Sequence, residues 1–309
     1  MPSFHINRSR TLKALLEEQG WHAAGKNEIA DFAMWTPEQG DERKAVCDVL
    51  DRQTIYKLDY KLSMFEILKN AGFEHLTPQT FSVLPDYLSY LKTTGETVDC
   101  FLKSNHGTNG EDVFYFNGMR PLMQKLISIR EMHGTAIIQS AVKNPLLIDN
   151  KKFKVRIYVL LLKDWTTFVF SEGLIVRHLK DFDPGSMHPD VHLSPNAGDT
   201  TELLSESGLE SKLGQKLRDT IVATVKSLQI SLGSADPISG TYQLMGYDFV
   251  VNSGFTPFLI EINGFPNFER RDPAGMSLSN QLMRDMIGMV INPEILGKNR
   301  ESGHFVPVL

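Results

Sequence analysis

Two β-prone runs around Asn252-Ser253-Gly254 constrain the fold of this chain more than any other feature. A turn of this composition between such runs predicts an antiparallel hairpin. If the loop is centred on Ser253 and Gly254, Asp248 lies opposite Leu259. The two-residue period of a strand then directs four side chains to one face: Asp248, Leu259, Glu261 and Asn263.

Two carboxylates and an amide oxygen on this face need an explanation, because the rest of both strands is apolar. In the predicted register Asp248 and Glu261 are diagonal neighbours, about 7–8 Å apart at the backbone. Like charges there repel each other, and burial would raise their pKa. A hard divalent cation such as Mg²⁺ would relieve the repulsion and complete its shell with phosphate oxygens. A hairpin with one solvated face explains the same pattern, and the pattern does not separate the two.

A second candidate segment begins at Lys103, at the end of a predicted strand over residues 98–103. The loop that follows, residues 104–110, contains Gly107 and Gly110, and a second predicted strand covers residues 113–116. Small residues let backbone amides approach phosphate, and a lysine on the strand can neutralise it. Neither a Walker A motif nor a G-x-G-x-x-G fingerprint is present. Taken alone, the segment favours an ordinary hairpin turn over a phosphate site.

A third candidate segment is the basic start of the β-prone run 154–162. Strand alternation places Lys152, Lys154 and Arg156 on one face, where three cations repel unless an anion lies among them. Triphosphate is a natural candidate, and a solvated basic edge strand is the alternative. Arg177, on the next predicted strand, could join this cluster. Residues 181–199 show little periodicity and are interpreted as a long active-site loop. His192 within this loop is interpreted as no more than a polar surface residue.

The remaining chain alternates helical and strand-like segments without an internal repeat, which favours an α/β or α+β architecture. Amphipathic helices are predicted over residues 11–19, 60–70 and 209–229. Changes in pattern near residues 56 and 135 suggest three units. We expect an N-terminal unit of residues 1–55, a central unit of residues 56–135 and a C-terminal unit of residues 136–309.

Composition excludes several classes of protein. The net charge of -5 argues against a nucleic-acid binder, which needs positive charge for phosphate. The longest apolar run, about six residues, is far shorter than the ~20 that span a bilayer, so no membrane association is expected. Two cysteines provide no disulfide framework. With no secretory signal at the start of the sequence, a cytoplasmic location is expected.

In chain order, the Lys103 segment, the basic strand and the hairpin at residues 242–267 resemble the parts of an ATP-grasp site, and the chain resembles the tubulin tyrosine ligase-like amino-acid ligases. The resemblance rests on FLKSNHGTNGEDVFYF (101–116), IIQSAVKNPLLIDNKKFKVRIYVLL (137–161), FSEGLIVRHL (170–179), HLSPN (192–196) and YQLMGYDFVV…TPFLIEINGFPN (242–267). Weaker matches are DFAMW (31–35), IYKLDYKLSMFEIL (55–68) and LTPQTFSVLPDYLSYL (76–91). The resemblance implies an ATP-grasp fold of mixed α/β (α+β) class. It would have a small N-terminal α/β domain and sheets rich in antiparallel pairs, flanked by helices.

The resemblance also implies roles for individual residues. Lys103 would contact nucleotide phosphate under the loop that holds Gly107 and Gly110, and Gln139 would lie beside the adenine. Lys152 and Arg156 would face ATP and an acyl-phosphate, and Arg177 would hold the carboxylate of the incoming amino acid. The implied ligands of Mg²⁺ are Asp248, Glu261 and Asn263.

The reaction implied is ATP-dependent joining of a free amino acid to a carboxylate of a protein, tubulin or another, through an acyl-phosphate. Two alternatives remain open: an ATP-grasp ligase for small molecules or peptides, and an inactive family member that binds a protein partner. The chain departs from the family at Lys154, where the family has an acidic residue. It departs also at Ser140, where Arg or Lys is usual, and at Ser194-Pro195, where the family has Thr-Asn.

Overall fold

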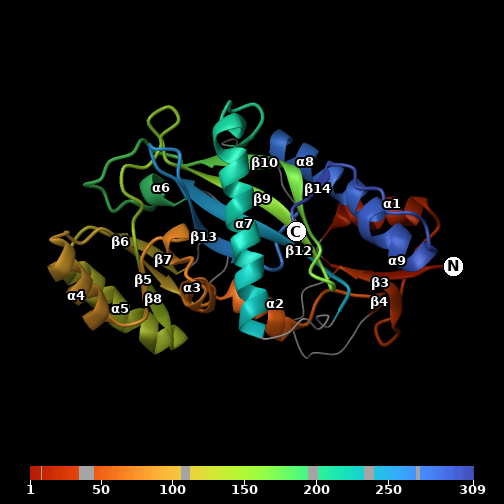
Figure 1. Ribbon diagram of the computed structural model, residues 1–309, viewed down its shortest axis with the longest axis horizontal. Helices are drawn as coiled ribbons and strands as arrows, with labels where there is room; N and C mark the ends of the chain where they lie inside the picture. Colours follow the sequence, from red (N-terminus) through yellow and green to blue (C-terminus); the bar gives the residue numbers. More distant parts are fainter. Residues whose placement is uncertain (8, 35–44, 106–111, 194–200, 233–239, 269–271) are drawn as a thin grey trace.

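The computed structural model describes residues 1–7, 9–34, 45–105, 112–193, 201–232, 240–268 and 272–309. In this part of the chain the strands form three sheets, each with its own helices (Figure 1). The expected mixed α/β class is confirmed, with antiparallel sheets flanked by helices. The predicted divisions after residues 55 and 135 remain predictions.

The N-terminal sheet is parallel and has the order β2-β1-β3-β4. Its strands are β1 (Ser3–Ile6), β2 (His22–Ala23), β3 (Ala30–Met34) and β4 (Ala45–Cys47). Helix α1 (Arg10–Glu18) begins at Ser9, whose side chain accepts a hydrogen bond from the amide of Leu12. A serine in this position satisfies a first-turn amide that has no acceptor within the helix.

The second sheet is antiparallel and has the order β5-β8-β6-β7. Its strands are β5 (Thr80–Phe81), β6 (Cys100–Ser104), β7 (Val113–Phe116) and β8 (Ala136–Ser140). The hairpin predicted around residues 104–110 is the β6–β7 pair. Helices α4 (Leu84–Thr94) and α5 (Met119–His133) pack on one face, where alternate residues such as Leu102 and Ile138 are buried. The other face carries Lys103 and Gln139 together with the apolar Phe101 and Ile137.

The central sheet has the order β11-β10-β9-β12-β13, and β14 (Phe305–Pro307) pairs with β10. Its other strands are β9 (Phe153–Leu162), β10 (Thr167–Arg177), β11 (Thr201–Leu203), β12 (Tyr242–Val251) and β13 (Pro257–Asn263). On one face α2 (Arg52–Asp59), α3 (Lys61–Asn70) and the long α7 (Glu210–Leu232) close a hydrophobic core over alternate strand residues, among them Val155, Ile157 and Phe249.

The opposite face of the central sheet is apolar at one end of β9 and charged at the other. At one end Tyr158, Leu160 and Leu162 pack beneath the N-terminal sheet and α8 (Pro273–Met286). The π-helical turn η2 (Ile287–Ile291) and α9 (Asn292–Leu296) follow α8 and extend this apolar cover. At the other end the same face carries Lys154 and Arg156. The candidate site therefore begins where the apolar cover ends.

The structure corrects the predicted register of the β12–β13 hairpin. Val251 pairs with Pro257 and Phe249 with Leu259, so the loop is one residue longer than expected. An irregularity of the bulge type at Ile260 then shifts the pairing, and Asp248 lies directly opposite Glu261. Leu259 and Ile262 both enter the core beneath α7, so Leu259 does not share the face of Asp248. The predicted common face of Asp248, Glu261 and Asn263 is nevertheless present.

We expect α7 to contribute to stability through its buried face alone. Leu228→Ala should lower the free energy of unfolding by about 2–5 kcal/mol, because Leu228 is fully buried in the core of the central sheet. Two residues further along the helix, Ile230 is 68% exposed. Ile230→Ala should therefore change the free energy of unfolding by no more than about 0.5 kcal/mol. Urea titration of both variants measures the difference. Equal losses would show that α7 does not cover this core.

Candidate active site

The second sheet presents a buried lysine and a glutamine on the face that α4 and α5 leave open. Lys103 Nζ donates to Gln139 Oε1 at 2.7 Å, and Gln139 Nε2 donates to Thr80 Oγ1 at 3.1 Å. Burial lowers the pKa of Lys103 to about 8, and the nearby Glu261 opposes this shift. A buried ammonium held by one neutral amide oxygen is poised to accept an anion. Gly107 and Gly110 lie outside the described residues.

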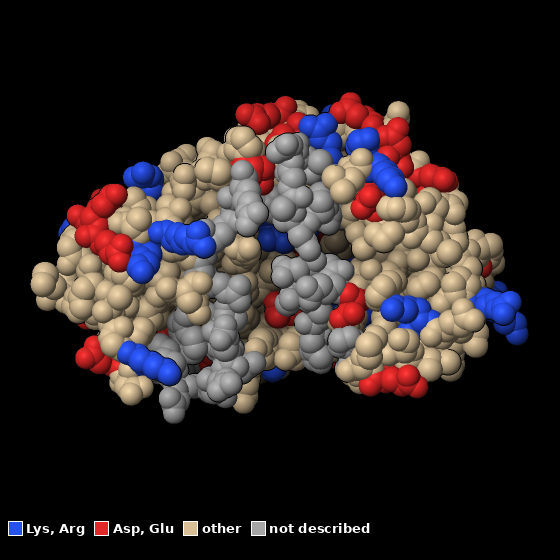
Figure 2. All heavy atoms as spheres, turned by 180° about the vertical axis from the view of Figure 1, so that it is seen from behind, with Lys and Arg blue, Asp and Glu red and all other residues tan. Residues whose placement is uncertain are grey.

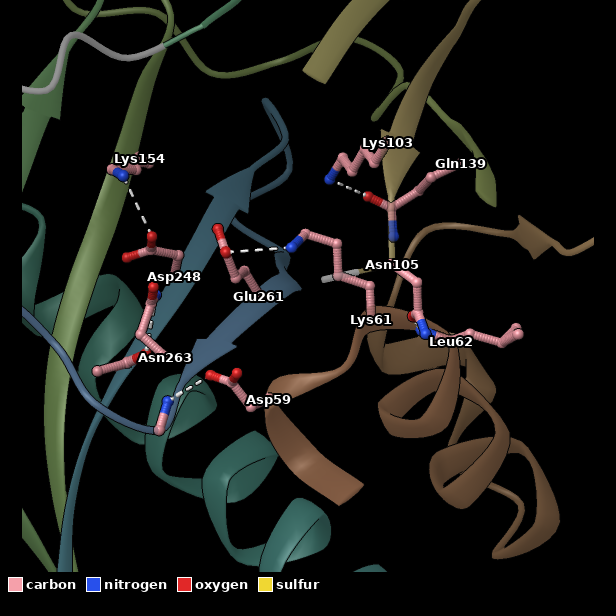
Figure 3. Close-up of polar contacts among 12 residues, drawn as sticks. Asp59, Lys61, Leu62, Lys103, Asn105, Gln139, Lys154, Asp248, Glu261 and Asn263 are labelled. Atoms are coloured by element: carbon pink, nitrogen blue, oxygen red, sulfur yellow. Dashed lines mark hydrogen bonds and ion pairs between the residues drawn. The ribbon is translucent and has the colours of Figure 1, made fainter. Parts of the chain in front are cut away.

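The central sheet presents a buried carboxylate between two cations. In the β9–β12 register Arg156 pairs with Asp248, which is 1% exposed. The Arg156 guanidinium donates through Nε to Oδ1 and through Nη2 to Oδ2, the latter at 2.7 Å. Lys154 Nζ donates to the same Oδ2 at 3.1 Å (Figure 3). The anion among these strand cations, expected to be a triphosphate, is here a carboxylate of the chain itself.

These contacts set the charge states of the pair. Burial favours the neutral form of Asp248, but Arg156 and Lys154 outweigh it and hold the pKa of the Asp248 carboxyl well below its usual range. Burial also disfavours the charged guanidinium, yet Asp248 raises the pKa of Arg156. Both groups therefore remain ionised near neutral pH.

A short elbow between α2 and α3 connects the two sheets. The Asp59 carboxylate accepts a hydrogen bond from the Gly264 amide at 2.7 Å, and burial raises the pKa of Asp59. Lys61 Nζ lies 3.4 Å from Glu261 Oε1. On the other side, the Leu62 amide donates to Asn105 Oδ1 at 3.0 Å. As Figure 3 shows, the elbow joins the end of β13 to the end of β6.

Lys61 was not among the residues singled out from the sequence, although a signal for it exists. It precedes Met64, Phe65 and Leu68 by three, four and seven positions, a spacing that places it on the buried face of α3. The structure confirms this placement, since Lys61 is 5% exposed. A lysine at a core position of a helix needs a partner of opposite charge, and Glu261 is that partner.

Lys152 lies in a separate aromatic surrounding. Its Nζ stands over the rings of Phe101, Tyr115 and Phe182, with 4.7 Å to the centroid of Phe182. Burial lowers the pKa of Lys152 to about 8. Its other neighbour is His192 Nδ1 at 3.1 Å. Because ring faces attract an ammonium, Lys152 can stay charged without a carboxylate in contact.

The interpretation of His192 as a surface residue is wrong. His192 belongs to the short helix α6 (Pro189–His192), is 3% exposed and stacks on Tyr115 with the ring centroids 3.6 Å apart. Burial lowers the pKa of His192 to about 4, and the Lys152 ammonium acts in the same direction. His192 is therefore neutral near pH 7.

Arg177 is not brought together with the other predicted residues. It pairs with Phe153 across β9 and β10, so its side chain lies on the α7 face of the sheet, opposite to Lys154 and Arg156. Its guanidinium contacts Asp149 Oδ2 at 2.7 Å and Glu202 Oε2 at 3.3 Å. This arrangement gives no support to an amino-acid clamp beside Asp248.

The converging groups carry an excess of positive charge. Lys61, Lys103, Lys154 and Arg156 face three carboxylates among the described residues, those of Asp59, Asp248 and Glu261. On the molecular face in Figure 2, by contrast, acidic and basic side chains are interspersed. The local excess of positive charge among the converging groups favours a polyanionic ligand.

The oxygen donors on this face fit a hard cation such as Mg²⁺. Asn263 Nδ2 donates to Gly246 O at 3.4 Å, which leaves Asn263 Oδ1 as a ligand atom. Among the described residues, Glu261 Oε2 has no hydrogen-bond partner. Within the same part of the chain no three His, Cys, Asp or Glu side chains are arranged so that they could hold a metal ion by themselves, so the amide of Asn263 is needed as a third donor.

Anion affinity should depend on pH through the two buried lysines. Since the pKa of Lys103 and of Lys152 is lowered to about 8, both are charged below that pH and neutral above it. We expect the affinity for inorganic triphosphate to fall as pH rises through about 8, as calorimetric titration can measure. Lys103→Arg keeps its charge and should lose less affinity. A flat profile between about pH 7 and pH 9.5 would contradict the assignment.

Asn105 should stabilise α3 from outside the helix. Tyr60, which precedes α3, provides no side-chain cap, and Asn105 accepts from the first-turn amide of Leu62 in its place. Asn105→Ala should lower the free energy of unfolding by about 1 kcal/mol, whereas Asn105→Asp keeps the acceptor oxygen and should lose less. Chemical denaturation compares the two. Unchanged stability of the alanine variant would mean that this bond is not formed in solution.

Comparison with known proteins finds relatives among enzymes that modify tubulin. Human tubulin polyglutamylase TTLL5 is 24% identical over 336 residues, covering 91% of this chain and 25% of that protein. Tubulin glycylase 3C of Tetrahymena thermophila is 25% identical over 244 residues, covering 69% of this chain and 22% of the glycylase. The probable tubulin–tyrosine ligase PBY1 of Saccharomyces cerevisiae is 26% identical over 202 residues, covering 54% and 25%.

The chain thus spans about a quarter of the length of these relatives. No helix of the described segments is both long and apolar enough to cross a bilayer. The model of the tubulin-tyrosine ligase family matches residues 45–201 and 190–298, a region that holds Lys61, Lys103, Arg156, Asp248 and Glu261. The chain belongs to the tubulin-tyrosine ligase family.

Proposed function

We propose that this chain binds ATP with Mg²⁺ and joins a free amino acid to a carboxylate of a protein acceptor. The observation that carries the proposal is the convergence of four cations with the oxygen donors of Asp248, Glu261 and Asn263. A triphosphate satisfies the positive excess, and a hard divalent cation satisfies the oxygen donors. Family membership supports the same class of reaction.

We propose a role for each residue from its contacts and from the family resemblance. Lys103, Lys61 and Arg156 neutralise phosphate oxygens, and Gln139 holds Lys103 and lies at the nucleotide base. Lys152 adds a further positive charge from its aromatic surrounding. Glu261, Asn263 and Asp248 would hold Mg²⁺, which supplies charge neutralisation at the phosphates when bound. The described residues thus serve positioning and electrostatic stabilisation, and the reaction needs no covalent nucleophile from the chain.

The proposed reaction has two steps. An oxygen of the acceptor carboxylate attacks the γ-phosphorus of ATP, and ADP leaves with the electrons of the broken P–O bond. The amine of the amino acid then attacks the acyl carbon, loses a proton, and inorganic phosphate leaves. Negative charge accumulates on phosphoryl oxygens in both steps, which is where fixed cations lower the barrier most.

The names of the relatives suggest the acceptor and the amino acid. They are described as a polyglutamylase, a glycylase and a probable tyrosine ligase, each of tubulin. We propose a protein acceptor, tubulin or another protein, and glutamate, glycine and tyrosine as the first amino acids to test. An ATP-grasp ligase for small molecules or peptides would use the same phosphate chemistry.

One observation favours an inactive family member that binds a partner. Lys154 occupies an oxygen of Asp248, a proposed metal ligand, with an ammonium. If this contact persists when nucleotide is present, Mg²⁺ loses a ligand and catalysis falls. The activity test below distinguishes this candidate from an active ligase.

Glu261→Gln should abolish ligation and preserve the fold. The substitution keeps the size of the side chain but removes the charge that faces Lys61 and would bind Mg²⁺. We expect transfer of labelled glutamate, glycine or tyrosine to tubulin to fall by about 100-fold or more. Circular dichroism checks the fold, and Glu210→Gln, on the exposed start of α7, is the matched control.

Two results would count against the proposal. Full ligation by Glu261→Gln would remove the metal role of this carboxylate. No ATP-dependent transfer by the unaltered chain to any protein or peptide acceptor, together with binding of tubulin, would favour the inactive member.

A further inference from the structure

Asp248 accepts hydrogen bonds from two cations, Arg156 and Lys154, although one cation is enough to neutralise its charge. Arg156 engages both carboxylate oxygens, a two-pronged contact that by itself neutralises the charge. Lys154 adds a second cation at Oδ2, 3.1 Å away. A carboxylate has about four acceptor sites, and cations occupy three of those of Asp248, including both sites of Oδ2.

The two cations differ in how easily they can leave. The Arg156 guanidinium is fixed by its two-pronged contact and lies across Gly246, where an added Cβ would come within 3.0 Å of Arg156 Nη1. The Lys154 side chain is 22% exposed and makes a single contact with Asp248. A lysine ammonium is a compact charge on a flexible stem, so it can move between two anions.

We propose that Lys154 is a resident cation of the site that competes with a divalent metal ion for Asp248. The inference rests on the proposed function only for the identity of the metal. In the chain without nucleotide, Lys154 occupies the oxygen that the metal needs and repels it by like charge. A bound polyphosphate draws the Lys154 ammonium to itself and frees one acceptor site of Asp248 Oδ2, while Arg156 Nη2 keeps the other. Metal binding is therefore weak alone and strengthened by polyanion.

The test uses Mn²⁺ alone as the probe, with binding followed by electron paramagnetic resonance of the free ion. Lys154→Met removes the ammonium, keeps a similar stem, and leaves Asp248 paired with Arg156. Lys154→Arg keeps the charge. Lys151→Met is the matched control, because Lys151 pairs with exposed Asp181 and not with Asp248. Circular dichroism verifies each fold, and Lys154→Gln replaces Lys154→Met if the latter does not fold.

We expect Lys154→Met to bind Mn²⁺ about tenfold more tightly or better than the unaltered chain, since a like charge beside the ligand oxygen is removed. Lys154→Arg and Lys151→Met should bind as weakly as the unaltered chain. Addition of inorganic triphosphate should reduce the difference between Lys154→Met and the unaltered chain.

Equal Mn²⁺ affinity of Lys154→Met and the unaltered chain would overturn the inference. So would an equal gain in Lys151→Met, which would indicate a general effect of net charge, or no Mn²⁺ binding by any of the variants. A separate calorimetric titration of the unaltered chain with Mg-ATP decides the proposed function. Because the Mn²⁺ titration contains no nucleotide, the two can fail independently.

Discussion

Asp248 keeps its charge inside the protein because Arg156 and Lys154 stand directly beside it. An isolated carboxylate at this depth would be costly, and removal of one partner of such a buried pair costs about 3–5 kcal/mol. The β9–β12 register sets the contact by pairing Arg156 with Asp248. The absence of a side chain at Gly246 provides the room in which the guanidinium lies. The neighbouring oxygen donors take their positions from the same two strands.

The elbow between α2 and α3 transmits this arrangement to the second sheet. Lys61 contacts Glu261 and Asp59 contacts Gly264, so the end of β13 is fixed by two interactions from one turn of chain. Asn105 caps the same helix from the end of β6. A displacement of one sheet relative to the other would therefore strain a helix N-terminus and a buried ion pair together. The elbow between α2 and α3, which belongs to neither sheet, thus keeps the charged groups of the two sheets close together.

Much of this could be predicted from the sequence, because strand alternation is a strong signal. The common face of Asp248, Glu261 and Asn263 followed from it, as did the face of Lys154 and Arg156. The register did not, since the longer loop and the irregularity at Ile260 each shift the pairing by one residue in the same direction. The total shift of two keeps Glu261 and Asn263 on the expected face, and neither feature leaves a mark in composition. The burial of His192 depends on Tyr115, 77 positions earlier, and the role of Lys61 on Glu261. The periodicity of one segment cannot reveal such contacts, because they join segments that are far apart in the sequence.

The change from apolar to charged residues along one face of β9 also fixes the register of this strand. Arg156 and Tyr158 are two residues apart on the same face, one in the site and one beneath the apolar cover. A shift of the strand by two residues would keep every side chain on its own face of the sheet. In one direction, however, it would bury the Arg156 guanidinium beneath the apolar cover, and in the other it would bring the Tyr158 ring among the charged groups. The boundary between the apolar cover and the charged site thus fixes the position of β9 along its own axis, because only one register places Arg156 in the site and Tyr158 beneath the cover.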